Sequence, residues 1–343
     1  MKILIITDSL FEQMGGSYIA VSSTAYELVK RGYDVKLISF NNGITRKRIK
    51  LFSVISKYDV VHYFGAWSVS LIQSFFVSKI LKKKFIITPM GTFEPWSLNQ
   101  KKIKKLTALY IYQKKILENT DLIHCTSLEE EENIKRLSSK IRTFVASHGI
   151  KRLNFKKKEI NKKLKRKALF FSRIHKKKGL IETLEAWNEV RPKNWEFYIV
   201  GPRGDETYDK VIRFINQKNL KNEIFIKDPI FKQSEKSKLM NECDISILFS
   251  KNENFGFTII ESLMHSLPVL TNYNVPWNSI KEYNAGWYIQ DNKKSLISTL
   301  KNISNLSDEE LSIKSKNAFE LSKKYDWEII FPKLKKMYEM IIS

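Results

Sequence analysis

The stretch Asn252–Glu261, which reads Asn-Glu-Asn-Phe-Gly-Phe-Thr-Ile-Ile-Glu, is the most informative segment of the sequence. The apolar run before it, Asp244–Phe249, predicts a buried strand, and a helix is expected to begin near Gly256. Glu253 then lies in the loop at the carboxyl end of the strand, and Glu261 lies within the next two helical turns. Ligands bind at this edge of α/β sheets, and a helix start favours a phosphate. One carboxylate is thus placed for a sugar and the other for a ribose, although a loop acid and a helix-surface acid would show the same spacing.

A basic cluster follows a second apolar run. Arg173 and Lys178 lie within Phe171–Gly179, directly after the expected strand Ala168–Phe171. Arginine offers a planar fork of donors and lysine a point charge, and such a pair can neutralise the diphosphate that leaves when a glycosidic bond breaks. Taken alone, the cluster is equally compatible with one more basic loop in a protein with 60 Lys and Arg against 36 Asp and Glu.

Short apolar runs alternate with helical stretches along the whole chain, which predicts an α/β protein with buried parallel sheets. A first series of strands is expected at Lys2–Thr7, Val35–Phe40, Val60–Phe64, Phe85–Thr88, Leu122–Thr126 and Thr143–Ala146, with a helix at Ser17–Arg31. A second series is expected at Ala168–Phe171, Glu196–Val200, Glu223–Lys227, Asp244–Phe249 and Pro268–Thr271, with helices at Leu180–Val190, Thr207–Gln217, Ser234–Asn241 and Thr258–His265.

The chain length and one charge run predict two domains. At 343 residues the chain is long for one domain and comfortable for two. Residues 151–167 contain ten Lys or Arg and one acid, Glu159, so this stretch cannot form core and is interpreted as the interdomain connection. We therefore expect domains at 1–155 and 156–325. The segment 326–343 contains an amphipathic helix, Glu328–Ile342, that packs on its own domain or crosses back to the first.

The amino-acid composition limits the classes of protein to which the chain can belong. Hydrophobic residues make up 43% of the chain, enough for two ordinary cores. The two cysteines, Cys125 and Cys243, fall in apolar runs, which indicates a reducing compartment and no disulfide framework. No segment has the roughly 18 consecutive apolar residues of a spanning helix, so a cytoplasmic protein is expected. The net charge of +24 would attract phosphates, nucleic acid or acidic lipid, but a lysine-rich solvated surface explains it as well.

Together the two clusters resemble the retaining glycosyltransferase family 4, also called glycosyl transferases group 1. That family has the GT-B fold, in which two Rossmann-like domains face a central cleft. It carries an Arg followed by Lys-Gly after the first strand of its C-terminal domain, and two Glu separated by seven residues, the first in a Glu-x-Phe-Gly context. The matching residues, in order, are Arg173, Lys178-Gly179, Glu253, Phe255-Gly256 and Glu261. Downstream, Ser266-Leu267-Pro268-Val269 fits a Gly-x-Pro-Val pattern in which Ser266 replaces the Gly.

The resemblance implies residue roles and a mechanism. Arg173 and Lys178 would bind the diphosphate, Glu261 the donor ribose, and Glu253 the donor sugar. The backbone around Glu253 would assist donor binding through Asn254, Phe255, Gly256, Phe257 and Thr258. The implied reaction is a front-face substitution, catalysed by Glu253, Arg173 and Lys178, in which the departing phosphate oxygen helps to take the acceptor proton. The resemblance implies no bound metal, because fixed cations and helix dipoles take its place, and no other cofactor, because the nucleotide sugar is a substrate.

The first domain contributes further candidates. Gly15 and Gly16 follow the first strand and resemble the family's glycine loop on the donor side, although any tight strand–helix turn would use them. His62 matches the first histidine of the family's His-x-His, whereas Phe64 replaces the second, and a lone histidine at the end of a strand is also typical of a structural residue. The resemblance also indicates acceptor-site candidates at the ends of two strands: His62, Trp67, Glu94 and Trp96.

Residues 97–117 predict one basic amphipathic helix. Its lysines, at positions 101, 102, 104, 105, 114 and 115, oppose an apolar set of Ile103, Leu106, Leu109 and Ile116. Relatives of this kind often rest a basic face of the first domain on acidic lipid, which favours peripheral contact with the inner face of a cell membrane. A core helix with a solvated face explains the pattern too.

The preferred hypothesis is a retaining transferase that moves a hexose from a UDP- or GDP-sugar to a glycan or lipid-linked acceptor. Because members of the family commonly act there, the resemblance implies a pathway of bacterial surface polysaccharide or lipopolysaccharide assembly. A GT-B-like sugar-nucleotide epimerase shares the fold, and a basic nucleic-acid-binding protein would share the charge. No recognition motif for DNA or RNA is present, however, so nucleic acid is not an expected partner. A nicotinamide dehydrogenase is disfavoured because no Gly-x-Gly-x-x-Gly follows Lys2–Thr7.

Overall fold

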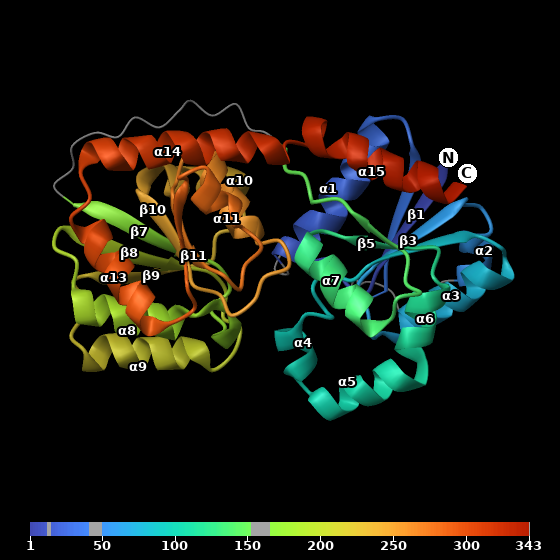
Figure 1. Ribbon diagram of the computed structural model, residues 1–343, viewed down its shortest axis with the longest axis horizontal. Coiled ribbons are helices and arrows are strands. Elements are labelled where there is room, and N and C mark those ends of the chain that lie inside the picture. The colour runs from blue at the N-terminus through green and yellow to red at the C-terminus, as the bar shows by residue number, and fades with distance from the viewer. Residues whose placement is uncertain (12–14, 41–49, 152–164, 343) are drawn as a thin grey trace. The chain divides into compact units, whose positions relative to one another are not determined.

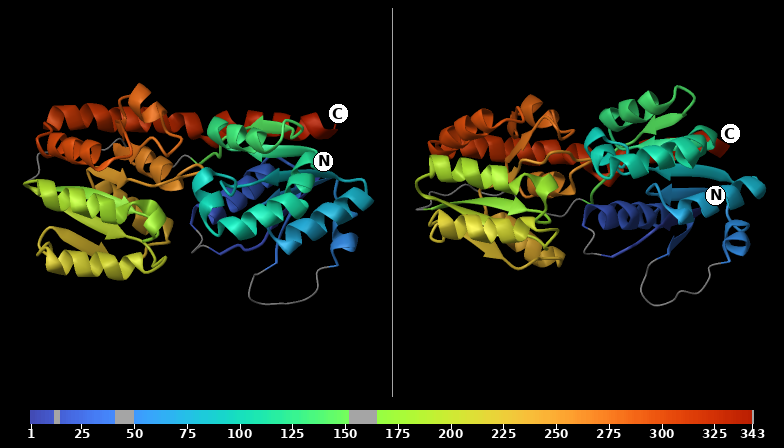
Figure 2. Two further views of the ribbon diagram at one scale, coloured as in Figure 1. Left: turned by 60° about the horizontal axis from the view of Figure 1, so that its bottom comes forward. Right: turned by 90° about the horizontal axis from the view of Figure 1, so that it is seen from below.

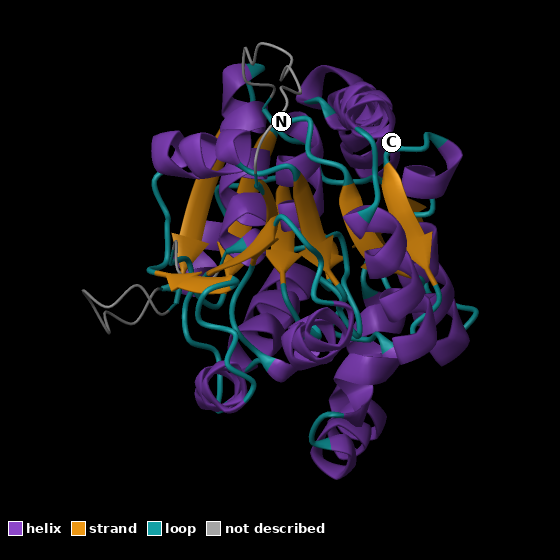
Figure 3. Ribbon diagram, turned by 90° about the vertical axis from the view of Figure 1, so that its left-hand side faces the viewer, coloured by secondary structure: helices purple, strands orange, loops and turns teal. Residues whose placement is uncertain are grey.

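The computed structural model describes residues 1–11, 15–40, 50–151 and 165–342 (Figure 1). Contacts within the chain divide it into two units, Met1–Lys151 with Tyr325–Ser343, and Arg152–Lys324. Each unit contains a six-stranded sheet in which every pairing is parallel, and helices cover the strands (Figure 3). The predicted α/β class with parallel sheets is therefore confirmed. Most of the predicted basic connection, residues 152–164, lies outside the described residues.

The sheet of the N-terminal unit has the order β2-β1-β3-β4-β5-β6. Its strands are β1 Lys2–Thr7, β2 Asp34–Ser39, β3 Val60–Phe64, β4 Lys84–Thr88, β5 Leu122–Cys125 and β6 Thr143–Val145. The chain runs outward in one direction from β1 to β2 and in the other direction from β1 through β3, so the strand order reverses between β1 and β3. Loops at the carboxyl ends of these two strands diverge to opposite faces of the sheet, and such a point is where open α/β sheets bind ligands.

Both faces of this sheet are covered by helices. These are α1 Gly16–Lys30, α2 Leu51–Ile55, α3 Val69–Ile80, α4 Pro95–Asn99, α5 Lys102–Ala108, the π-helix η2 Leu109–Gln113, α6 Lys114–Asn119, α7 Leu128–Leu137 and α15 Trp327–Ile342. Successive side chains of a strand point to opposite faces. In β1, accordingly, Leu4 and Ile6 belong to one hydrophobic cluster, and Ile3 and Ile5 belong to another.

Helix α15 belongs to the N-terminal unit although the C-terminal unit precedes it in the chain (Figure 1, Figure 2). Its buried face packs in the same cluster as Ile3 and Ile5 of β1 and Leu28 of α1. The helix residues in that cluster recur at intervals of three and four: Trp327, Ile330, Phe331, Leu334, Met337, Tyr338 and Ile341. This spacing places them on one face of an α-helix. The apolar face of α15 therefore completes the core on one side of the N-terminal sheet.

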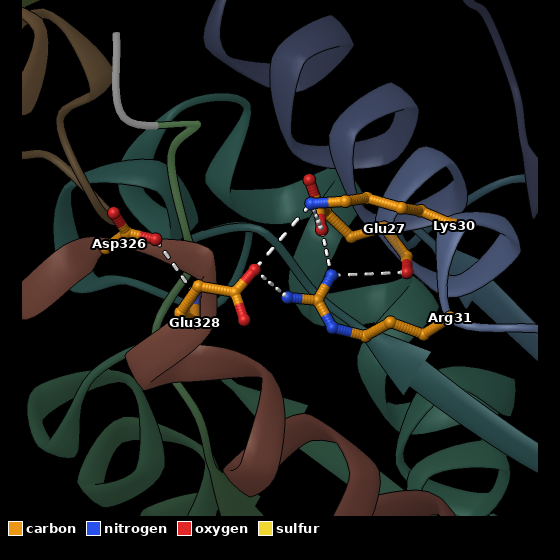
Figure 4. A network of polar contacts seen from close by, with 5 residues as sticks. All are labelled: Glu27, Lys30, Arg31, Asp326 and Glu328. Atoms are coloured by element: carbon orange, nitrogen blue, oxygen red, sulfur yellow. Dashed lines mark hydrogen bonds and ion pairs between the residues drawn. The ribbon is translucent and has the colours of Figure 1, made fainter. Parts of the chain in front are cut away.

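A polar network at the start of α15 fixes its position against α1 (Figure 4). Arg31 follows α1 and bonds to the carboxylate of Glu27, which is buried, and to Oε1 of Glu328 at 2.8 Å. The guanidinium also lies 4.2 Å from the centre of the Phe331 ring. The backbone N–H of Glu328 donates to Asp326 at 2.9 Å. One guanidinium thus bridges a buried acid on α1 and an exposed acid on α15.

A chain of buried hydrogen bonds crosses the same sheet. His124 Nε2 lies 2.8 Å from the Ala146 carbonyl, which only accepts, so this nitrogen carries the proton. His124 Nδ1 then accepts from the Thr88 hydroxyl at 2.9 Å, Thr88 accepts from His62 Nε2 at 2.7 Å, and His62 Nδ1 accepts from the Tyr338 hydroxyl at 2.6 Å. Burial lowers the pKa of His62 well below its usual range and the pKa of His124 to about 4, so both rings are neutral at neutral pH.

The predicted continuous helix over 97–117 is wrong. Helix α4 ends at Asn99, Lys101 has a left-handed backbone with φ 55°, and η2 interrupts the segment from 109 to 113. The apolar residues do not share one buried face either, since Ile103 is 84% exposed and Leu106 is 47% exposed, whereas Ile116 is 2% exposed. Leu98, Leu109 and Tyr112 pack against the hydrophobic core from partly buried positions, and Gln113, Ile116 and Leu117 are buried.

The C-terminal unit has the strand order β12-β11-β10-β7-β8-β9. Its strands are β7 Arg166–Phe171, β8 Trp195–Val200, β9 Ile224–Lys227, β10 Ile245–Leu248, β11 Val269–Asn272 and β12 Gly286–Ile289. The helical segments are η3 Lys176–Lys178, α8 Leu180–Val190, α9 Thr207–Gln217, α10 Gln233–Glu242, α11 Phe257–Met264, α12 Ser279–Glu282, α13 Lys293–Ser304, α14 Asp308–Ser322 and η4 Lys323–Tyr325. Within this unit α8 contacts α9 and α13, and α14 contacts α11 and α12 (Figure 2). The strand order reverses between β7 and β10, and the order is that of dinucleotide-binding sheets.

None of the helices in the described part of the chain combines the length and the apolar character that crossing a bilayer requires. Cys125 and Cys243 are both buried, and neither takes part in a disulfide.

We predict that Arg31→Met lowers the free energy of unfolding of the N-terminal unit by about 2 kcal/mol, because the buried carboxylate of Glu27 loses its closest cation. Lys30→Met is the matched control, since Lys30 reaches the same two acids from an exposed position at 3.6 Å or more. Its loss should change stability by less than about 0.5 kcal/mol. Urea denaturation of both variants gives the comparison, and equal losses would contradict the role assigned to Arg31.

Candidate active site

The predicted donor-site residues of the C-terminal unit meet at one edge of its sheet. Arg173 and Lys178 lie on the loop between β7 and α8, and Glu253 lies on the loop between β10 and α11. Strands β7 and β10 are neighbours, and the strand order reverses between them. The two loops that the sequence singled out are therefore the two that leave the switch point of this sheet.

The β7–α8 loop is held by close backbone contact with the loop after β8. The Ile174 N–H donates to the Pro202 carbonyl at 2.9 Å, and the Gly204 N–H donates to the Ile174 carbonyl at 2.9 Å. A Cβ atom on Gly201 would lie 1.9 Å from the Ser172 carbonyl oxygen. Only glycine permits this approach, so the backbone that carries Arg173 is fixed before any ligand arrives.

Lys178 and Glu253 form an ion pair across the two loops, with 2.5 Å between Nζ and Oε1. The side chains are 16% and 10% exposed, so the pair is largely removed from water. Burial raises the pKa of Glu253, but the charges of Lys178 and Lys177 and hydrogen bonds from Lys178 and Ser250 outweigh it, and the pKa is lowered overall. Glu253 is therefore an ionised acceptor at neutral pH.

Arg173, unlike Lys178, has a charged group that is not engaged by a carboxylate of the described residues. Its side chain is exposed, and it makes no salt bridge with any residue that the structure describes. His175, two residues further on, is held by Asp205, whose carboxylate lies 3.6 Å from Nε2. The loop thus presents one free guanidinium beside a paired ammonium group, which is a suitable arrangement for an incoming diphosphate.

Helix α11 begins at Phe257 after Gly256, which has a left-handed φ of 82°. No side chain caps its first turn. The free N–H groups of a helix start attract an anion, so the start of α11 adds to the positive character of this edge. The Phe255 carbonyl accepts a hydrogen bond from the Trp277 indole, which fixes the turn. The side-chain oxygen of Asn254 is buried and has no hydrogen-bond partner among the described residues.

Glu261 lies one turn further along α11 and pairs with a lysine that sequence reasoning missed. Its Oε1 lies 3.3 Å from Nζ of Lys236 on α10, and both side chains are largely buried. Burial raises the pKa of Glu261, although the charge and hydrogen bond of Lys236 partly oppose the shift. Nothing in the sequence distinguishes Lys236 from its neighbours Lys232 and Lys238, because the pairing follows from the packing of α10 beside α11.

The structure places the candidate residues of the N-terminal unit in different environments. His62 is fully buried and both of its ring nitrogens are bonded within the core, so it is a structural residue in this unit and not an exposed acceptor contact. Glu94 is buried and accepts a hydrogen bond from Asn133, whereas Trp67 and Trp96 are half-buried. Gly15 precedes α1 with φ 60°, and Gly16 is the first residue of that helix.

Metal binding has no evident candidate among the residues that the structure describes, since they contain no group of three or more His, Cys, Asp or Glu side chains placed to hold an ion.

The two parallel sheets, the switch-point loops and the Arg–Lys and Glu–Glu pattern define the GT-B class of glycosyltransferases. Residues 151–320 match the family model described as glycosyl transferases group 1. The chain belongs to this family.

Similar proteins with solved structures share the fold over the full chain. A structure of Anabaena Alr3699/HepE in complex with UDP and glucose superposes with a TM-score of 0.76 at 15% identity, covering 100% of both chains. WaaG, a glycosyltransferase involved in lipopolysaccharide biosynthesis, gives a TM-score of 0.70 at 14% identity, covering 97% of this chain and 98% of WaaG. An uncharacterized 41.2 kDa protein in the cps region of Klebsiella pneumoniae is 25% identical over 229 residues. That match spans 63% of this chain and 61% of the Klebsiella protein.

We predict that Gly179→Ala strongly destabilises the C-terminal unit and displaces the Lys178 loop. Gly179 has φ 63°, and an added Cβ would lie 1.8 Å from the Phe249 carbonyl oxygen. Asn219→Ala is the matched control, since Asn219 is an exposed residue of the same unit with φ 54°. Backbone strain alone should cost about 1 kcal/mol in the control, and the clash should bring the loss for Gly179→Ala above about 3 kcal/mol. Thermal unfolding of the two variants tests this prediction, and equal decreases in Tm would refute the steric argument.

Proposed function

We propose that the protein is a retaining hexosyltransferase that uses a UDP- or GDP-sugar. The observation that carries this proposal is the edge formed by Arg173, Lys178 and Glu253, where two cations meet one ionised carboxylate at a sheet switch point. A dianionic diphosphate would be attracted there, and a carboxylate beside it can accept a hydrogen bond from a sugar hydroxyl.

Donor binding would change which partners the charged side chains of this edge contact. In the free protein Lys178 is engaged by Glu253, whereas Arg173 is not paired with a described residue. Arg173 would therefore receive the diphosphate first, and Lys178 would then be shared between a phosphate oxygen and Glu253. As the bond from the sugar to the phosphate lengthens, negative charge grows on the leaving oxygen, and two fixed cations stabilise that charge. The same oxygen is then placed to take the proton of an acceptor on the same face of the sugar.

Glu261 would bind the ribose of the donor. Its carboxylate is oriented by Lys236, so its oxygens are held in place before the nucleotide arrives. The backbone between Asn254 and Thr258 would contribute N–H donors at the start of α11, and Gly15 and Gly16 would approach the donor from the N-terminal unit. We assign the C-terminal unit to the nucleotide sugar and the N-terminal unit to the acceptor, with Trp67, Glu94 and Trp96 as its candidate contacts.

The acceptor would be a glycan or a lipid-linked sugar in the assembly of a bacterial surface polysaccharide. Two similar proteins support this pathway. One lies in the cps region of Klebsiella pneumoniae, and WaaG is involved in lipopolysaccharide biosynthesis. The use of a uridine nucleotide is supported by the complex of Alr3699/HepE with UDP and glucose.

We predict that Arg173→Ala and Glu261→Ala affect different kinetic constants. Arg173→Ala should lower kcat about 100-fold with a smaller change in the donor KM, because charge on the diphosphate grows in the transition state. Glu261→Ala should raise the donor KM about tenfold, because a ribose contact is present before and during the reaction. The measurement is release of nucleotide from UDP-glucose, UDP-galactose and GDP-mannose in the presence of a glycan acceptor.

Arg213→Ala is the control for the loss of charge, since Arg213 is an exposed arginine on α9 of the same unit. Wild-type turnover in Arg173→Ala would eliminate the electrostatic role. Conversion of the donor sugar without any acceptor would identify an epimerase instead.

We further propose that α5 and η2 rest on an anionic membrane surface. Ile103, Tyr110 and Ile111 are 84%, 87% and 62% exposed, which is unusual for large apolar side chains on a helix. Lysines at positions 101, 102, 104, 114 and 115 are exposed around them. Apolar side chains ringed by lysines suit insertion among acidic headgroups, and each lysine near the surface adds about 1 kcal/mol.

We predict that Ile103→Asp reduces binding to vesicles of phosphatidylglycerol at least tenfold, because it removes an inserted side chain and adds a charge of the wrong sign. Ile313→Asp on α14 is the matched control, with the same change of side chain and charge at a residue that is 48% exposed. Co-sedimentation with anionic and with phosphatidylcholine vesicles gives the comparison. Equal loss in the two variants would show that net charge alone governs binding.

A further inference from the structure

The loop between β7 and α8 makes a tight turn at Lys178, and His175 lies at the start of that turn. His175 has an extended backbone with φ −147° and ψ 146°, and the three residues after it form η3. The turn ends at Gly179, which has a left-handed φ of 63°. The place of the Lys178 ammonium group therefore depends on what holds this turn in shape.

Each backbone N–H of the turn has a hydrogen-bond partner, and His175 supplies two of the three. The Lys176 N–H donates to Asp205 Oδ2 at 3.2 Å. The Lys177 N–H donates to Nδ1 of the His175 ring at 3.0 Å. The Lys178 N–H donates to the His175 carbonyl at 2.8 Å. A short turn cannot supply all these acceptors from its own backbone, and the ring of His175 provides the missing one.

The ring of His175 can accept this hydrogen bond only in its neutral form. An imidazole nitrogen that accepts carries no proton, so the proton of the neutral ring is on Nε2. That nitrogen faces the carboxylate of Asp205, with 3.6 Å between Nε2 and Oδ2. The other oxygen of the carboxylate accepts from the Thr207 N–H at 3.0 Å, which fixes it to the first turn of α9. Asp205 therefore favours the tautomer that leaves Nδ1 free to accept.

The surroundings of His175 keep its ring neutral at neutral pH. Burial lowers the pKa of His175 below its usual range; the carboxylate of Asp205 opposes this shift, and the charges of Arg173, Lys176 and Lys178 add to it. The other charged side chains on the loops packed against the turn have partners of their own: Arg203 with Asp209, Glu206 with Lys210, Lys251 with Glu182, and Glu253 with Lys177 and Lys178. A proton on Nδ1 would turn an acceptor into a donor that faces another donor.

The turn is also bonded to the loop that carries Glu253. The Lys251 N–H, two residues before Glu253, donates to the Lys177 carbonyl at 2.8 Å. Lys177 is thus bonded through its N–H to the His175 ring and through its carbonyl to the loop after β10. A change at the ring is therefore passed to both loops that form the ion pair of the donor site.

We propose that the neutral ring of His175 is a positioning residue of the donor site: its Nδ1 holds the turn that presents Lys178, and a proton on that nitrogen releases the turn. The inference deepens the proposed function and rests on it. Donor affinity is then fully present above the pKa of His175 and is lost as the pH falls through that pKa. A histidine that bound the diphosphate as a cation would give the opposite slope, since its protonation would strengthen binding.

Two variants separate the acceptor at Nδ1 from the rest of the ring. His175→Asn keeps an acceptor, since the side-chain oxygen of Asn before a helical turn accepts from the N–H two residues further on, and it does not titrate. His175→Ala has no acceptor. The probes are UDP-glucose, UDP-galactose and GDP-mannose. At neutral pH, His175→Ala should bind the preferred nucleotide sugar about tenfold more weakly, and His175→Asn should stay within about twofold of the wild type. Equal losses in the two variants overturn the proposal.

The pH dependence of the same affinity tests the sign of the effect. Calorimetry is run between about pH 4.5 and 8, a range that includes the titration of a histidine whose pKa is lowered. The doubly esterified diphosphate of a nucleotide sugar does not change its charge there. The affinity of His175→Asn relative to the wild type should rise about fivefold toward the acid end. A constant ratio, or a wild-type affinity that rises in acid, overturns the proposal.

A measurement on the free protein distinguishes failure of this inference from failure of the proposed function. In the ¹⁵N-labelled full chain, the backbone amide signal of Lys177 should shift in step with the titration of the His175 ring, and it should not do so in His175→Asn. A Lys177 signal that ignores the ring overturns the inference, whether or not a nucleotide sugar binds. If the signal follows the ring but none of the three nucleotide sugars binds, the transferase proposal fails instead.

Discussion

The ion pair between Lys178 and Glu253 is the interaction on which the arrangement of the C-terminal sheet edge depends. It joins the loops that leave β7 and β10, and the charge of Lys178 helps to lower the pKa of the Glu253 carboxyl although that group is largely removed from water. Breaking such a pair leaves an uncompensated buried charge. The loops are therefore locked to each other in the absence of ligand. Glycines at 179 and 201 allow the backbone contacts that make this lock possible, because any side chain there would collide with a carbonyl oxygen.

Both units place their candidate functional residues at the reversal of the strand order, although the two sheets have different strand orders. In each sheet the functional candidates lie on the loops that diverge at the reversal, after β1 and β3 in one and after β7 and β10 in the other. The electrostatics differ. The C-terminal edge presents Arg173 and a helix start, which suit an anion, whereas the N-terminal edge carries the carboxylate of Asp8, which accepts a hydrogen bond from Tyr63. The proposed reaction between a nucleotide diphosphate and a glycan acceptor would use this difference in charge.

The strands and the positions of the two candidate acids could be predicted from the sequence, because they depend on local patterns of residues. All eleven expected strands are present, and the spacing from Glu253 to Glu261 placed both acids correctly on a loop and on α11. Strand β12, Gly286–Ile289, was missed because it is four residues long and lies at the sheet edge with half-exposed side chains. For His62 the sequence left a structural role and an acceptor contact both open, because its partner Tyr338 lies 276 residues away. Lys236 could not be recognised either, since its significance comes from its pairing with Glu261 in three dimensions.

The place of α15 has a consequence for how the chain matures during synthesis. Its side chains share a hydrophobic cluster with Ile3 and Ile5, yet the ribosome makes them only after the whole C-terminal unit. Domains usually fold in the order in which they emerge. Here the first unit to emerge lacks one face of its core until the end, whereas the second is a continuous stretch that can finish earlier. The nascent N-terminal sheet therefore exposes an apolar face for most of translation, and it is the part of the molecule that most needs protection by chaperones.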